Sequence, residues 1–107
     1  MDSVFNVEPV SLDGHARVRF VGELDMPEVD RAKADVIDAL DQSTGDLTID
    51  LSGLTFCDSS GARLLYQLDA EAKNRGRAMV LQSPTPAVHR VLNVLGIDYL
   101  LTIKDAP

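Results

Sequence analysis

The sequence predicts an α/β domain whose central sheet is mostly parallel and begins with an antiparallel hairpin, in the order β-β-α-β-α-β-α-β. Segments with the two-residue period of strands alternate along the whole chain with segments that have the apolar spacing of amphipathic helices. This alternation implies right-handed crossovers between parallel strands. With 107 residues, the chain suits a single domain over residues 1–107, and we expect a frayed tail at 104–107.

Residues 4–10 and 16–22 are expected to form the hairpin. In the second segment apolar and basic side chains alternate, which is typical of a half-buried strand. Asp13 and Gly14 lie between the two segments and are a strong signal for a hairpin turn. Pro9 cannot donate a ladder hydrogen bond, so we expect the first segment at an edge of the sheet.

The first two helices are expected over residues 24–42 and 62–76. Asp25 is a suitable N-cap for the first helix, and Glu28 three residues later completes a pattern like a capping box. Gly76 suits the position just after the second helix, where a left-handed backbone is common.

The third helix is expected over residues 83–96, with Thr85 as its N-cap and Pro86 as its first residue. Gly96 is expected to stop this helix. The remaining strands are expected at residues 46–54, 77–82 and, as a last short strand or a final turn, 98–103.

Charge and composition disfavour several classes of partner. The net charge of −7 argues against direct nucleic-acid binding, which needs a basic surface, and against binding to anionic membranes. No apolar run approaches the ~18 residues that span a bilayer. The first residues lack the basic start of a secretory signal, so we expect a cytoplasmic protein.

Cys57 is the only cysteine in the chain. A single cysteine rules out an intrachain disulfide and a cysteine-based zinc site. The residues around it are apolar, which predicts a buried structural thiol.

Two short polar segments stand out because each follows a core strand and opens a helix. They are "GELD" at residues 22–25 and "CDSSG" at residues 57–61. The carboxyl ends of parallel strands meet at one edge of a sheet, so both segments should lie on the same rim. We therefore expect Glu23, Asp25 and Asp58 to lie near one another.

Two serines, Ser59 and Ser60, lie where the second helix is expected to start. The plain interpretation is that both serines only cap the helix. The alternative is that one serine caps while the hydroxyl of the other points outward, with Gly61 letting the backbone approach a ligand or partner. The acidic neighbours disfavour a free phosphate, but a covalent phosphate would persist and would change how the rim docks.

Enzymatic interpretations find little support. There is no G-x-S-x-G motif at Ser59 and no glycine-rich nucleotide motif. Neither His15 nor His89 is placed as a clear base. An acidic magnesium pocket built from Asp25 and Asp58 matches the receiver-domain pattern poorly. We expect no catalytic residue, no metal and no cofactor.

The sequence resembles STAS domains, and in particular the stand-alone bacterial anti-sigma factor antagonists. The resemblance rests on "GELD" at 22–25, "DLTIDLSGLTFCDSSGARLL" at 46–65 and "TPAVHRVLNVLG" at 85–96, and it covers nearly the whole chain. It implies that the unphosphorylated protein binds an anti-sigma factor that is also a serine kinase, which frees a sigma factor. Phosphorylation would end this capture, and a phosphoserine phosphatase would reset it. ATP and magnesium would belong to the kinase.

Matched position by position, the resemblance makes Ser59 the phosphorylated serine, so we expect its hydroxyl to point outward and Ser60 to cap the helix. Arg63 departs from the family, where a small or apolar residue is common, and it could pair with Asp58 or later with phosphoserine. We expect a monomer when the protein is free. The residues expected to contact the partner are Glu23, Asp25, Asp58, Ser59, Ser60, Gly61 and Arg63.

Two other functions are compatible with the sequence. The first is a STAS accessory subunit of an ABC-type membrane transport assembly, because the same fold serves there and fold alone does not decide function. The second is a divergent nucleotide-binding enzyme on this fold. The intact D-S-S-G element favours the phosphorylation switch over the first, and the second needs a pocket that the sequence does not indicate.

Overall fold

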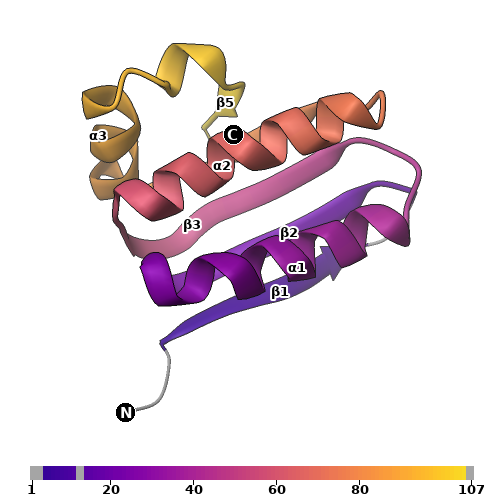
Figure 1. The fold of residues 1–107 in the computed structure, drawn as a ribbon, viewed down its shortest axis with the longest axis horizontal. Helices are drawn as coiled ribbons and strands as arrows, with labels where there is room; N and C mark the ends of the chain where they lie inside the picture. The colour runs from indigo at the N-terminus through magenta and orange to yellow at the C-terminus, as the bar shows by residue number, and fades with distance from the viewer. Residues whose placement is uncertain (1–3, 12–13, 106–107) are drawn as a thin grey trace.

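The computed structural model describes residues 4–11 and 14–105 and has the predicted order of elements (Figure 1). The strands are β1 (Phe5–Ser11), β2 (Ala16–Leu24), β3 (Leu47–Cys57), β4 (Met79–Gln82) and β5 (Ile103–Lys104). The helices are α1 (Val29–Asp41), α2 (Ser59–Asn74) and α3 (Pro86–Val94), with short 3-10 helices η1 (Met26–Glu28) and η2 (Asp98–Leu100). The predicted α/β fold is confirmed.

The five strands form one sheet in the order β1-β2-β3-β4-β5. The first two strands pair antiparallel and the other neighbouring pairs are parallel. The strand order never reverses, so right-handed crossovers place the helices on the same face of the sheet. Figure 1 shows α1 and α2 lying side by side over the strands. A sheet without a reversal has no crevice of the kind that opens where strand order changes direction.

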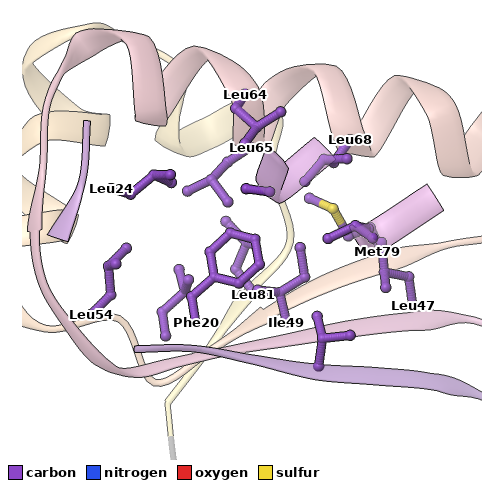
Figure 2. Close-up of a cluster of buried hydrophobic side chains, with 14 of the residues drawn as sticks. Phe20, Leu24, Leu47, Ile49, Leu54, Leu64, Leu65, Leu68, Met79 and Leu81 are labelled. Carbon is purple, nitrogen blue, oxygen red and sulfur yellow. The ribbon is translucent and has the colours of Figure 1, made fainter. Parts of the chain in front are cut away.

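The core lies between the helices and one face of this sheet. Alternate residues of β3 point inward, and Leu47, Ile49 and Leu51 are fully buried. Figure 2 shows leucines of α2 directed at the buried side chains of the strands. The side chains of the intervening residues are partly or fully exposed on the other face. Among them, Arg19 Nε and Asp50 Oδ2 lie 4.0 Å apart. The sheet therefore buries one face and leaves the other to solvent.

The start of the first helix differs from the prediction. The α-helix begins at Val29, after a 3-10 turn that Glu28 N closes by donating to Asp25 O at 2.9 Å. The Asp25 carboxylate makes no capping hydrogen bond, and the Glu28 carboxylate pairs with Arg31 at 2.6 Å instead. The predicted capping box is therefore wrong, because the tight turn satisfies the backbone in its place.

Helix α3 has the predicted N-cap residue, Thr85. Thr85 Oγ1 accepts a hydrogen bond from Val88 N at 3.4 Å and donates one to Leu54 O at 3.0 Å, and Pro86 is the first helical residue. Gly76 and Gly96 both follow helices with φ of 71°, as predicted for helix-ending glycines.

Smaller differences concern the hairpin turn, β4 and the tail. Of the predicted turn, Asp13 lies outside the described residues, whereas Gly14 has a positive φ of 91°. Strand β4 begins two residues later than expected because Arg77 N still donates to Ala72 O, at 2.9 Å. Lys104, placed by the sequence in the tail, pairs with Gln82 in the sheet, and residues 106–107 lie outside the described part.

We predict that β4 is sensitive to truncation on only one of its faces. Leu81→Ala should lower the free energy of unfolding by about 2–5 kcal/mol, because Leu81 is fully buried in the core. The neighbouring Val80→Ala should cost about 1 kcal/mol or less, because Val80 is only partly buried. Urea denaturation measures both values. Equal losses would mean that the second face is also covered.

Candidate functional site

The two polar segments meet at one rim of the sheet, as the sequence predicts. Strands β2 and β3 pair in parallel up to their last residues, with Glu23 opposite Phe56 and Leu24 opposite Cys57. The chain then enters η1 after β2 and α2 after β3. The segments "GELD" and "CDSSG" therefore end side by side.

The carboxylate of Asp58 joins these two segments. Its Oδ1 accepts a hydrogen bond from Gly61 N at 2.8 Å, which caps α2. Its Oδ2 accepts a second one from Met26 N at 3.1 Å, in the segment that follows β2. The Asp58 backbone N also donates to Leu24 O at 3.2 Å. Asp58 thus caps α2 and also fixes the segment of the same chain that follows β2.

The structure corrects the expectation that Ser60 caps α2. Asp58 has the extended backbone of an N-cap residue, with φ −87° and ψ −177°, and its side chain is the cap. Ser59 and Ser60 are the first two residues of the helix itself, which begins three residues earlier than predicted. Ser59 is exposed and Ser60 is partly buried, so the Ser59 side chain lies at the surface as expected.

Gly61 is buried at the contact between α2 and the end of β2. A Cβ atom at this position would lie 2.8 Å from Cys57 Sγ and 2.8 Å from Leu24 Cγ and Leu24 O. The glycine therefore allows the helix to approach the sheet closely. Close packing of α2 against the end of β2 is therefore enough to explain why a glycine lies here. The approach of a ligand or partner to this backbone, which the sequence suggested, is not needed for that explanation.

Two large apolar residues on the rim were not predicted from the sequence. Met26 is 70% exposed and Phe56 is 46% exposed. Strand β3 has an extra residue at two places in its pairing with β2, so that Leu54 and Cys57 point inward and Phe56 points outward. The signal in the sequence is the break in alternation after Leu51, where apolar residues no longer follow a period of two.

We refer below to the rim surface. It consists of Glu23, Asp25, Met26, Phe56, Asp58, Ser59, Ser60 and Arg63. Its acidic side chains lie at or just after the ends of β2 and β3. Met26 directly follows Asp25, and Phe56 lies near the end of β3, two residues before Asp58. Such a mixture of exposed apolar and charged groups is typical of surfaces that bind another protein.

Arg63 is exposed on α2 beside a shallow hollow of about 230 Å³. The hollow lies between η1, α1 and α2, and it is lined by Met26, Val29, Asp30, Ser60, Arg63 and Gln67. Within the described residues Arg63 forms no ion pair. The suggested pairing with Asp58 is absent, since both oxygens of Asp58 bind backbone amides.

Two kinds of feature are absent from residues 4–11 and 14–105. No group of three or more His, Cys, Asp or Glu side chains in this part could hold a metal ion. None of its helices is both long and apolar enough to cross a membrane. His15 Nδ1 accepts a hydrogen bond from Asp46 N at 3.2 Å at the start of β2, and His89 is exposed on α3. Neither histidine belongs to the segments that form the rim.

Cys57 is buried beneath the rim, as predicted for a structural thiol. Burial raises the pKa of its thiol to about 12, and the negative charge of Asp58 adds to the effect. The thiol therefore stays protonated and unreactive at neutral pH.

Comparisons with known proteins agree with this fold. A family model described as "Mlab, STAS domain" matches residues 9–102. The structure of the anti-sigma factor antagonist SpoIIAA in its unphosphorylated form is similar, with 28% identity, a TM-score of 0.74, and coverage of 96% of this chain and 88% of that chain. SpoIIAA, a Bacillus cell fate determinant, in the phosphorylated form has 27% identity, a TM-score of 0.69, and coverage of 96% and 91%.

An anti-sigma factor antagonist from Mycobacterium paratuberculosis has the same fold. It is 24% identical, has a TM-score of 0.75, and the match covers 94% of this chain and 85% of that chain. At this identity the similarity concerns the fold.

We predict that Asp58 stabilises the rim and that Asp25 does not. Asp58→Ala should lower the free energy of unfolding by about 1–2 kcal/mol, because it leaves a helix cap and a second amide without their acceptor. Asp25→Ala is the matched control and should change it by less than about 0.5 kcal/mol, because the Asp25 carboxylate makes no capping bond. Thermal and urea denaturation measure both effects. A larger loss at Asp25 would contradict the assignment.

The raised pKa of Cys57 predicts how stability varies in alkali. The unfolded chain loses the thiol proton above about pH 9, whereas the folded chain keeps it until about pH 12. The free energy of unfolding should therefore fall as pH rises between these values, by up to about 1.4 kcal/mol per pH unit. Cys57→Ala should remove this component, which denaturation of both proteins across the range reveals. Identical slopes for the two proteins would show that the thiol does not contribute.

Proposed function

The chain belongs to the STAS domain family, and on this basis we propose that it is an anti-sigma factor antagonist in a partner-switching pathway. The unphosphorylated form would bind an anti-sigma factor that is also a serine kinase, and so release a sigma factor. Phosphorylation of Ser59 would reverse this binding. The proposal is supported by the similarity to an anti-sigma factor antagonist known in unphosphorylated and phosphorylated forms.

The observation that carries this proposal is the position of Ser59. It is exposed at the first residue of α2, directly after the cap that Asp58 provides. Its hydroxyl makes no hydrogen bond to the described residues. The capping role belongs to its neighbour, so the Ser59 hydroxyl is available to a kinase without loss of the helix cap.

The proposed chemistry is transfer of the terminal phosphoryl group of ATP to Ser59 Oγ. A bond forms between Oγ and phosphorus, the anhydride bond to the leaving ADP breaks, and the hydroxyl proton passes to a base of the kinase. A phosphatase would restore the serine by hydrolysis, with release of inorganic phosphate. In both steps this chain is the substrate, and we propose that it has no enzymatic activity of its own.

The effect of the phosphate follows from the charge already present on the rim surface. A phosphoserine adds about −1.5 to −2 charges at pH 7 to a surface that already carries Glu23, Asp25 and Asp58. A partner that covers the exposed side chains of Met26 and Phe56 would have to desolvate this dianion. A loss of ~2.7 kcal/mol is enough to weaken binding about 100-fold.

We propose further that the protein acts in the cytoplasm and is a monomer when free. The partner would supply an apolar pocket with basic groups around it, to complement Met26, Phe56 and the rim acids. Of the residues that the sequence placed in the contact, Gly61 is buried, so it supports the surface from beneath. Glu23, Asp25, Asp58, Ser59, Ser60 and Arg63 remain in the proposed contact.

We predict that substitutions at Ser59 separate binding from switching. Ser59→Asp should weaken capture of the anti-sigma factor severalfold or more, because it places a charge on the contact surface. Ser59→Ala should keep capture and abolish phosphorylation. Ser60→Ala is the matched control and should affect neither strongly. Calorimetric titration measures capture, and mass spectrometry after incubation with the kinase locates the phosphate.

Two results would contradict this prediction. Phosphate on Ser60 alone, or on neither serine, would remove Ser59 from its role. Recovery of a transporter ATPase instead of a kinase, when the protein is purified from its own cells, would favour the transport subunit.

A further inference from the structure

Arg63 brings a positive charge to an otherwise acidic rim. Several basic side chains of the protein already have acidic partners, among them Arg31 with Glu28 at 2.6 Å and Lys73 with Asp69 at 2.8 Å. Arg63 has none within the described residues and is exposed. The chain carries a net charge of −7. Other basic residues, such as Arg17, also lack an ion pair in the described part of the chain, but Arg63 is the one basic residue of the rim surface.

The helix places Arg63 next to Ser59. The two residues are four positions apart in α2, and side chains at this spacing lie on successive turns, roughly 5–6 Å apart at Cβ. The Cα–Cβ bonds of a helix tilt toward its N-terminus, so the long side chain of Arg63 can extend back to the first turn. An oxygen-rich group attached to Ser59 would therefore lie within its reach.

No other acid on the rim already holds Arg63. Both oxygens of Asp58 accept hydrogen bonds from backbone amides, of Gly61 and Met26. Asp30 lines the same hollow from α1 but forms no ion pair with Arg63 within 4.0 Å. A phosphate dianion would be a stronger partner than either carboxylate, because a guanidinium can bind two of its oxygens at once.

We propose that Arg63 binds the phosphate on Ser59, so that phosphorylation both adds negative charge to the rim surface and withdraws its arginine from the partner. This inference rests on the proposed function, since it concerns the phosphorylated form. It makes Arg63 a positioning residue that holds the phosphate against the start of α2. Phosphorylation then changes two features of the docking surface in one step.

The second ionisation of the phosphate reports on this contact. The rim surface and the hollow beside Arg63 carry four carboxylates, from Glu23 at the end of β2, Asp25 before η1, Asp30 in α1 and Asp58 at the cap of α2. These charges raise the pKa of the phosphate, whereas a bound guanidinium lowers it. Removal of Arg63 should therefore raise that pKa, which lies near 6 for free phosphoserine.

The test uses protein that carries phosphoserine at position 59, incorporated during translation, and follows its ³¹P NMR signal through a pH titration. Arg63→Gln should raise the phosphate pKa by about 0.3 unit or more. Arg63→Lys should raise it less, because the positive charge remains. The increase should shrink in high salt.

The matched control is Arg17→Gln, which removes the same charge elsewhere. Arg17 also forms no ion pair within the described residues, and it lies near the start of β2, roughly 23 Å along the strand from Leu24. The control should leave the phosphate pKa unchanged. Equal shifts in Arg63→Gln and Arg17→Gln, or no shift in either, would overturn the proposal.

The test of the contact between Arg63 and the phosphate is independent of the test of the proposed function. The phosphoserine is installed without a kinase, so the titration gives its answer whether or not a kinase uses Ser59. A normal kinase reaction with no effect of Arg63 on the phosphate pKa would refute the contact alone. A clear effect of Arg63 with no phosphorylation by any cognate kinase would refute the function alone.

Discussion

The carboxylate of Asp58 is the interaction on which the rim of this protein depends. It binds the amides of Gly61 and Met26 at 2.8 and 3.1 Å, and so joins two segments that are far apart in the sequence. The same residue starts α2, which places Ser59 at the surface. Gly61 allows the helix to approach Leu24 and Cys57 closely enough for this arrangement.

The topology explains why the site is a surface and not a pocket. In a sheet whose strand order reverses, a crevice opens between helices on opposite faces. Here the strand order does not reverse and the helices cover one face, so no such crevice forms. The hollow beside Arg63 is shallow, about 230 Å³ in volume, whereas exposed Met26 and Phe56 offer apolar contact area. A surface of this kind suits a protein partner, and a single covalent phosphate is enough to change its charge. The proposed switch therefore needs no rearrangement of the fold.

Much of the fold could be predicted from the sequence because its local signals agree with its topology. Thr85 and Pro86 mark the start of α3, and the parallel arrangement brings residues 22–25 next to residues 57–61. The cap of α2 could not be assigned in this way, because Asp, Ser and Ser in succession can each cap a helix and only the backbone conformation decides among them. The exposure of Phe56 depends on irregular pairing between β2 and β3, which is a property of two strands together.

The central claim is that one carboxylate holds both sides of the rim, and amide hydrogen exchange followed by NMR tests it most directly. The amides of Gly61 and Met26 should exchange slowly in the native protein, and both should become fast in Asp58→Ala. The Ser60 amide, which has no hydrogen-bond partner among the described residues, should exchange fast in both proteins. Exchange at Gly61 as fast as at Ser60 in the native protein would contradict the account.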